Sequence, residues 1–96
     1  MSDFISGTEA RQMIETQSAL LIDVRNPPEF QAGTAPGAIN VPVNLIPHKA
    51  KEINVSLPVI VFCRSGARSS QAQMILQGMG FVNVKNAGGL QDYLNS

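Results

Sequence analysis

Two short, continuous apolar runs constrain the fold of this chain more than any other feature. They cover residues 19–24 and 58–62, and Asp23 is the one polar side chain within them. A strand exposed on one face alternates apolar and polar residues, whereas a strand buried on both faces is apolar throughout. The two runs therefore predict strands at the centre of a sheet that is covered on both sides.

Helical patterns lie between these runs. Ser6-Gly7-Thr8-Glu9 has the form of a capping box and predicts a first helix over about residues 7–16. Apolar residues three and four apart predict a second helix over about 68–77. The other expected elements are a helical turn over 27–33, strands over 38–41 and 81–84, a short irregular helix within 43–55, a turn at Gly88-Gly89 and a last helix over 90–94. Strands alternating with helices predict an α/β fold, a small parallel sheet of four or five strands with helices on both faces.

Length and charge exclude several classes of protein. Ninety-six residues suit a single domain, 1–96, and seven basic residues balance seven acidic ones. This balance argues against nucleic-acid binding and against a polybasic membrane anchor. One cysteine and one histidine leave no Cys- or His-rich metal site, and no metal or organic cofactor is expected.

The N-terminus has no signal-peptide pattern, and no apolar run approaches the ~18–20 residues of a membrane span. A lone thiol without an export signal is typical of a reducing compartment. We therefore expect a cytoplasmic protein without a membrane partner, although a mature form cut from an exported precursor would have the same features.

The loop after the second apolar run carries the strongest nucleophile of the chain, Cys63. Ligands of open α/β sheets bind beyond the carboxyl ends of the strands, where this loop lies. A tight loop would turn its backbone N–H groups toward the thiol, and the following helix would add the positive end of its dipole. Arg64 and Arg68 would bring two positive charges. We therefore predict an accessible Cys63 thiolate with a lowered pKa. The predicted substrate-binding residues around it are Arg64, Ser65, Gly66, Ala67 and Arg68.

A structural alternative stands beside this interpretation. A lone cysteine is most often a small buried hydrophobic residue. Two arginines are rarely buried unpaired, however, and here they follow the cysteine almost directly. The flanking residues therefore favour a reactive cysteine that binds an anion.

Three charged residues, Asp23, Arg25 and Glu29, follow the first apolar run. They could border the mouth of the site, or they could form an ion-pair network that ties this loop to the next turn. We favour the network. Ser65 and Ser69 could donate to a sulfur held on Cys63 or cap the helix that follows it, and we favour capping for Ser69.

Four ordered stretches of the chain resemble the single-domain rhodaneses, a family of sulfurtransferases. They are 21–30, 33–42, the loop 63–69, and a closing stretch at 80–84 with 88–90. One departure is visible, because relatives usually have Gly-His-Ile-Pro-Gly where this chain has Gly33-Thr34-Ala35-Pro36-Gly37. That position lies outside the catalytic loop, so it puts local packing in doubt rather than the reaction.

The resemblance implies a thiosulfate sulfurtransferase of rhodanese-like fold. Cys63 would take the outer sulfur of a small anionic donor such as thiosulfate as a persulfide. It would then pass that sulfur to cyanide or to a thiol, and a thioredoxin-like protein is compatible with the second role. Two alternatives stay open: a cysteine-dependent phosphatase or arsenate reductase, and a non-catalytic rhodanese-like binding module. The first needs Cys-x5-Arg, but the required position here is Ser69, and the second typically lacks the cysteine.

Overall fold

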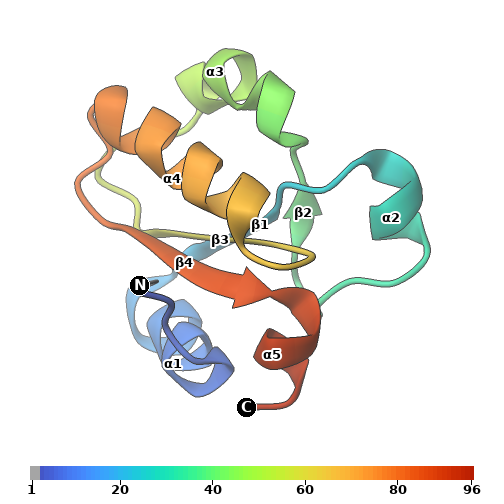
Figure 1. The fold of residues 1–96 in the computed structure, drawn as a ribbon. Coiled ribbons are helices and arrows are strands. Elements are labelled where there is room, and N and C mark those ends of the chain that lie inside the picture. Colours follow the sequence, from blue (N-terminus) through green and yellow to red (C-terminus); the bar gives the residue numbers. More distant parts are fainter. Residues whose placement is uncertain (1–2) are drawn as a thin grey trace.

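A parallel four-stranded sheet organises the computed structural model, which describes residues 3–96 (Figure 1). The strands are β1 (Leu20–Asp23), β2 (Ile39–Asn40), β3 (Val59–Cys63) and β4 (Val84–Gly89), in the order β2-β1-β3-β4. The helices are α1 (Gly7–Gln17), α2 (Pro27–Gln31), α3 (Ile46–Lys49), α4 (Ala67–Gly78) and α5 (Leu90–Leu94). Two 3₁₀ helices, η1 (Val43–Leu45) and η2 (Ala50–Glu52), flank α3. The predicted α/β class and the irregular helical segment within 43–55 are confirmed.

Both faces of the sheet are covered, as the apolar runs predict. Helices α3 and α4 lie over one face, and α1 and α5 lie over the other (Figure 1). Ile60 and Phe62 of β3 pack on the side of α1 and α5. Val61 and Cys63 of the same strand pack on the side of α4. Full burial of one such apolar side chain contributes about 1.5–3 kcal/mol. The alternation of side chains along β3 therefore places Cys63 under α4, at the carboxyl end of the strand.

Helix α1 begins at the predicted capping box. The Glu9 amide donates to Ser6 Oγ over 3.0 Å, and the Ser6 amide donates to Glu9 Oε1 over 3.3 Å. These bonds satisfy two backbone donors that have no partner within the helix.

Within residues 3–96, no helix has the length and apolar character that crossing a membrane would need.

The last strand lies further along the chain than predicted. The prediction of a strand over 81–84 and a turn at Gly88-Gly89 is wrong, because β4 runs from Val84 to Gly89. Asparagine and glycine disfavour strands, so local propensity argues against this placement. Pairing with β3 overrides propensity, from Val59 opposite Val84 to Cys63 opposite Gly89. The end of β4 is thereby fixed beside the cysteine loop.

Candidate active site

The backbone of the cysteine loop turns inward at Gly66. This residue precedes α4 and has φ 104° and ψ −13°, a left-handed conformation that favours glycine. Its N–H group donates to Cys63 Sγ over 2.9 Å. The loop thus directs a backbone donor at the sulfur, as its position between a strand and a helix predicts.

Ser69 also faces the sulfur, which corrects its assignment as a helix cap. Gly66 occupies the N-cap position of α4, and Ser69 lies inside the first turn with none of its surface exposed. Its Oγ is 3.4 Å from Cys63 Sγ and 3.1 Å from the Gly66 carbonyl oxygen. A hydroxyl has one proton. When Cys63 is a neutral thiol, Ser69 can donate its proton to the Gly66 carbonyl oxygen. When Cys63 is a thiolate, Ser69 can donate it to the sulfur instead.

These contacts determine the ionisation of Cys63. Burial alone would raise the pKa of its thiol, but hydrogen bonds from the Ser69 side chain and from the amides of Ser69, Ser65 and Gly66 outweigh that effect. The net result is a lowered pKa, in the direction predicted. Hydrogen bonds, rather than the two arginines, are the main cause.

The prediction of an accessible thiol is wrong in this structure. Cys63 is 0% exposed, because it lies under its own loop and packs in the core between β3 and α4. A short loop that turns its amides inward covers the sulfur with its own backbone. A reagent must therefore reach the sulfur through movement of the loop residues that cover it.

A hollow of about 380 Å³ adjoins the loop. Its walls come from the segments after β1 and β3 and from α2 and α5. The lining residues are Arg25, Glu29, Ala32, Arg64, Leu90 and Gln91. Since Arg64 follows Cys63 directly, this hollow is a recess beside the loop from which a small molecule could approach the sulfur.

Arg68 forms an ion pair with Glu29, one of the three charged residues that follow the first apolar run. Its two terminal nitrogens donate to the carboxylate oxygens over 2.7 and 3.0 Å. The hydrogen bond from Arg68 is the largest influence holding the pKa of Glu29 at about 2, so the carboxylate is charged at neutral pH. Within residues 3–96, the exposed guanidinium of Arg64 has no hydrogen-bond or ion-pair partner. Arg64, rather than both arginines, therefore supplies an unpaired positive charge at the hollow.

Asp23 and Arg25 form one ion pair of the predicted three-residue network, whereas Glu29 pairs with Arg68 instead. Asp23 is 0% exposed and accepts hydrogen bonds from the Arg25 amide and guanidinium over 2.7 to 3.1 Å. The guanidinium also donates to the Gly33 carbonyl over 2.6 Å. Thr34 Oγ1 lies 2.8 Å from Asp23 Oδ2 and completes the arrangement. Thr34 stands where the sequence departs from the rhodanese pattern, and the departure places a hydroxyl beside the buried carboxylate.

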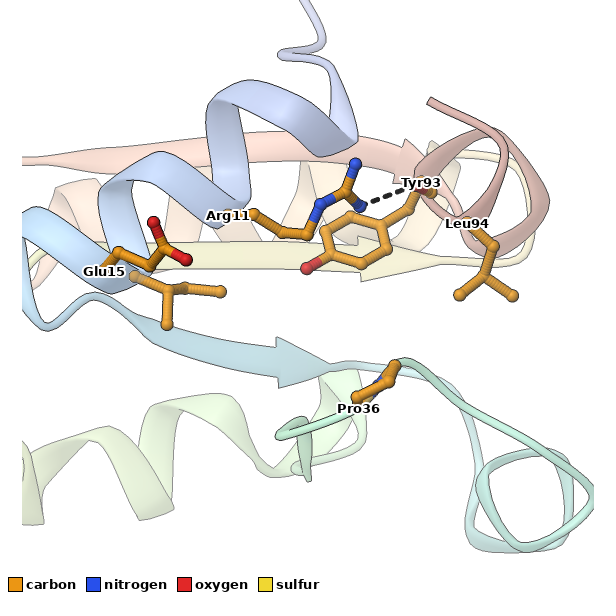
Figure 2. Close-up of a pocket in the computed structure, with 6 residues that line it drawn as sticks. Arg11, Glu15, Pro36, Tyr93 and Leu94 are labelled. Atoms are coloured by element: carbon orange, nitrogen blue, oxygen red, sulfur yellow. Dashed lines mark hydrogen bonds between the residues drawn. The ribbon is translucent and has the colours of Figure 1, made fainter.

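A second hollow, of about 320 Å³, lies between α1, α5 and the segment before β2 (Figure 2). Its lining residues are Arg11, Ile14, Glu15, Pro36, Tyr93 and Leu94. The wall is mostly apolar, and Arg11 donates to the backbone carbonyl of Tyr93 at its rim. None of the lining residues belongs to the cysteine loop, so this hollow is separate from the candidate site.

Across residues 3–96, no three His, Cys, Asp or Glu side chains gather closely enough to hold a metal ion. The groups at the site are the Cys63 sulfur, the backbone and hydroxyl donors around it, and the arginine side chains near the loop. Together they can hold a negatively charged sulfur and attack a sulfur electrophile.

Comparisons with known proteins agree with this chemistry. The family model of the rhodanese-like domain matches residues 6–96. The chain is 36% identical to a sulfurtransferase of Allochromatium vinosum, over 93% of this chain and 83% of that protein. It is 41% identical to the thiosulfate sulfurtransferase PspE of Escherichia coli, over 74% of this chain and 70% of that protein.

The solved structures give the same result. The human single-domain sulfurtransferase TSTD1 superposes with a TM-score of 0.84 at 27% identity, covering 100% of this chain and 98% of that one. Relatives named sulfurtransferases support sulfur transfer as the kind of reaction. With its fold and its sequence both matched along nearly the whole chain, this protein belongs to the rhodanese-like domain family.

Proposed function

We propose that this protein is a thiosulfate-type sulfurtransferase in which Cys63 carries the transferred sulfur as a persulfide. The observation that carries the proposal is the 2.9 Å hydrogen bond from the Gly66 amide to Cys63 Sγ. A backbone donor held at this distance favours a thiolate over a thiol, and the thiolate is the nucleophilic form of cysteine.

The first step forms the persulfide. The Cys63 thiolate attacks the outer sulfur of thiosulfate, a new sulfur–sulfur bond forms, and the old one breaks. Sulfite leaves with the electron pair of the broken bond. The product is a Cys63 persulfide whose outer sulfur carries the negative charge, which donors at the loop can stabilise.

The second step removes the sulfur. A nucleophile, either cyanide or a thiolate, attacks the outer sulfur, and the Cys63 thiolate departs with the bonding electrons. Cyanide becomes thiocyanate, whereas a thiol acceptor becomes a persulfide. Covalent catalysis of this kind divides one difficult transfer into two easier ones.

Each loop residue has a role in this scheme. The Ser65 and Gly66 amides stabilise the sulfur anion, and Ala67 begins the helix whose positive end faces the site. Arg64 attracts the anionic donor from the adjoining hollow, and Arg68 tunes the local charge through Glu29. The hollow is the approach that we assign to a thiol acceptor, including that of a thioredoxin-like protein.

Incubation with thiosulfate tests the proposal. We expect the intact mass to rise by one sulfur atom, peptide mapping to place that atom on Cys63, and sulfite to appear in equal amount. Adding cyanide should restore the original mass and release thiocyanate. The proposal is contradicted if Cys63 can be fully alkylated by a thiol reagent but the protein takes up no sulfur from thiosulfate. Hydrolysis of p-nitrophenyl phosphate should be undetectable, and turnover of that compound would favour the phosphatase alternative.

Charge changes at the Glu29–Arg68 pair should alter donor binding in opposite directions. Arg68→Gln leaves the Glu29 carboxylate unpaired near the hollow, so the KM for thiosulfate should rise roughly two- to fivefold. Glu29→Gln releases the Arg68 guanidinium, so the KM should fall by a similar factor. Glutamine also retains an oxygen for the bond from the Asn26 amide. Steady-state kinetics at low ionic strength measure both effects.

The variant with both substitutions is the control. It carries no net charge at this pair and should have a KM close to that of the wild type. Both shifts should shrink when salt is added, because exposed charges are screened. Single variants that moved KM in the same direction would show that the pair acts through structure rather than charge.

A further inference from the structure

The ring of Phe4 lies against two glycines at the active site, on the outside of the cysteine loop. A Cβ atom built on Gly66 would lie 2.3 Å from Phe4 Cζ, and one built on Gly88 would lie 2.6 Å from Phe4 Cδ2. Both glycines have positive φ, 104° and 76°. Neither position can carry a side chain without moving the ring, so the ring packs directly on the backbone of the loop and of β4.

The segment that carries Phe4 is fixed on both sides. The Ile5 amide donates to the Asn86 carbonyl over 2.9 Å, which attaches the chain to the edge of β4. Ser6 caps α1 directly afterwards. The start of the described chain therefore lies beside β4 (Figure 1), and Phe4 is 38% exposed with its buried part against the glycines.

Hydrogen bonds also hold the carbonyl group of Gly66 in place. Its oxygen accepts hydrogen bonds from Ser69 Oγ over 3.1 Å, from the Ser70 amide over 2.9 Å and from Ser70 Oγ over 2.8 Å. Its N–H group points the other way, to Cys63 Sγ. The Gly66 N–H and C=O belong to two successive peptide units, which are joined by the φ and ψ angles of Gly66. Contacts that hold these angles therefore keep this N–H directed at the sulfur.

A buried asparagine connects these contacts to β4. Asn86 is 2% exposed, and its amide group donates to Ser70 Oγ over 3.0 Å. Its side-chain oxygen accepts from the Gly88 amide over 2.8 Å. Gly66 and Gly88, the two glycines under Phe4, are thus joined through Ser70 and Asn86. The Phe4 ring lies against the same two residues.

We propose that Phe4 is a positioning residue of the active site, whose ring holds Gly66 and Gly88 in place so that the Gly66 N–H stays directed at Cys63. Glycine has more backbone freedom than any other residue, so its conformation must be restrained by contacts from outside. The inference rests on the proposed function, since a fixed donor matters for chemistry only if Cys63 reacts as a thiolate.

The test is the pH dependence of Cys63 alkylation by iodoacetamide in the full-length protein. The midpoint of the profile reports the ionisation of the thiol, and the plateau at high pH reports access to it. In Phe4→Ala we expect the midpoint to move to higher pH, with the rate below the midpoint falling roughly three- to tenfold. The plateau should rise because the loop opens more often. Phe4→Leu, which retains part of the volume, should shift the midpoint less.

Val55→Ala is the matched control. Val55 is an apolar residue of similar exposure, 42%, and it lies before the amino end of β3, opposite Cys63. Its profile should equal that of the wild type. Thermal unfolding of each variant shows that the comparison is made between folded proteins, and Phe4→Leu carries the test if Phe4→Ala does not fold.

The outcomes separate the two proposals. A wild-type midpoint typical of an ordinary thiol would overturn the thiolate basis of the proposed function. If the wild-type midpoint is low and folded Phe4→Ala has the same midpoint, only the role of Phe4 is overturned. Folded Phe4→Leu decides the matter in the same way if the alanine variant does not fold. A midpoint raised equally in Val55→Ala would also overturn it, because the shift would then follow general destabilisation rather than contact with the glycines.

Discussion

Cys63→Ser should take up no sulfur from thiosulfate, and its rate of thiocyanate formation should fall at least roughly a thousandfold. A serine hydroxyl is not ionised at neutral pH and cannot form a persulfide. The substitution nearly preserves the shape of the side chain, and the Gly66 amide and the Ser69 hydroxyl keep an acceptor in place of the sulfur. The loss should therefore reflect the nucleophile alone, with little change in thermal unfolding.

Intact mass after thiosulfate treatment and the thiocyanate assay measure this effect together. Because Cys63 is the only cysteine of the chain, no other thiol can carry the persulfide. Cys63→Ala should behave as the serine variant does. Met74→Ala is the control, since it removes an exposed sulfur on α4, the helix that follows the Cys63 loop, and should retain full activity. Bound sulfur that persists in folded Cys63→Ser would show that the assignment of the nucleophile is wrong.

The sequence predicts those parts of the fold whose cause is local. Buried strands are apolar throughout, and a capping box begins a helix wherever it stands, so β1, β3 and α1 are all predictable. Strand β4 is not, because Asn86, Gly88 and Gly89 are poor strand formers. Its place depends on pairing with β3, which only the assembled sheet supplies.

The site divides in the same way. A tight loop between a buried strand and a helix directs a backbone donor at Cys63, and the sequence suffices to predict the resulting shift of the thiol pKa. The role of Ser69 depends on where α4 begins, and a start at Ala67 places it inside the first turn. The partner of Arg68 is Glu29, on a helix 39 residues earlier in the chain. No local pattern predicts that pair, or the contact of Phe4 with the loop.

Asp23→Ala should be the most destabilising of the substitutions considered, with a loss of about 3–5 kcal/mol in the free energy of unfolding. The Asp23 carboxylate is wholly buried and accepts hydrogen bonds from Arg25 and Thr34. Without it, the guanidinium of Arg25, a residue that is only 7% exposed, loses its ion-pair partner but stays largely removed from water. A loss of this size is a large part of the 5–15 kcal/mol that typically separates the folded from the unfolded state.

Urea unfolding measures the loss, and thiocyanate formation per folded molecule shows whether the chemistry is affected. We expect the activity of the folded fraction to be largely retained, because the Asp23 carboxylate accepts its hydrogen bonds from Arg25 and Thr34 and none from a residue of the Cys63 loop. A stable but inactive Asp23→Ala would show that this carboxylate takes part in the reaction. Thr34→Val should cost less, since it removes one of the carboxylate's hydrogen bonds and leaves both charges paired.

Replacing both partners separates the cost of an unpaired charge from the value of the pair. In Asp23→Ala combined with Arg25→Met, no charge is left buried, and the methionine retains much of the apolar length of the arginine. This variant should recover a substantial part of the stability lost in Asp23→Ala, because desolvation of the lone guanidinium no longer opposes folding. If the double variant were no more stable than Asp23→Ala, charge balance would not explain the loss. The hydrogen bonds that the carboxylate accepts would then be what holds the loop after β1 in place.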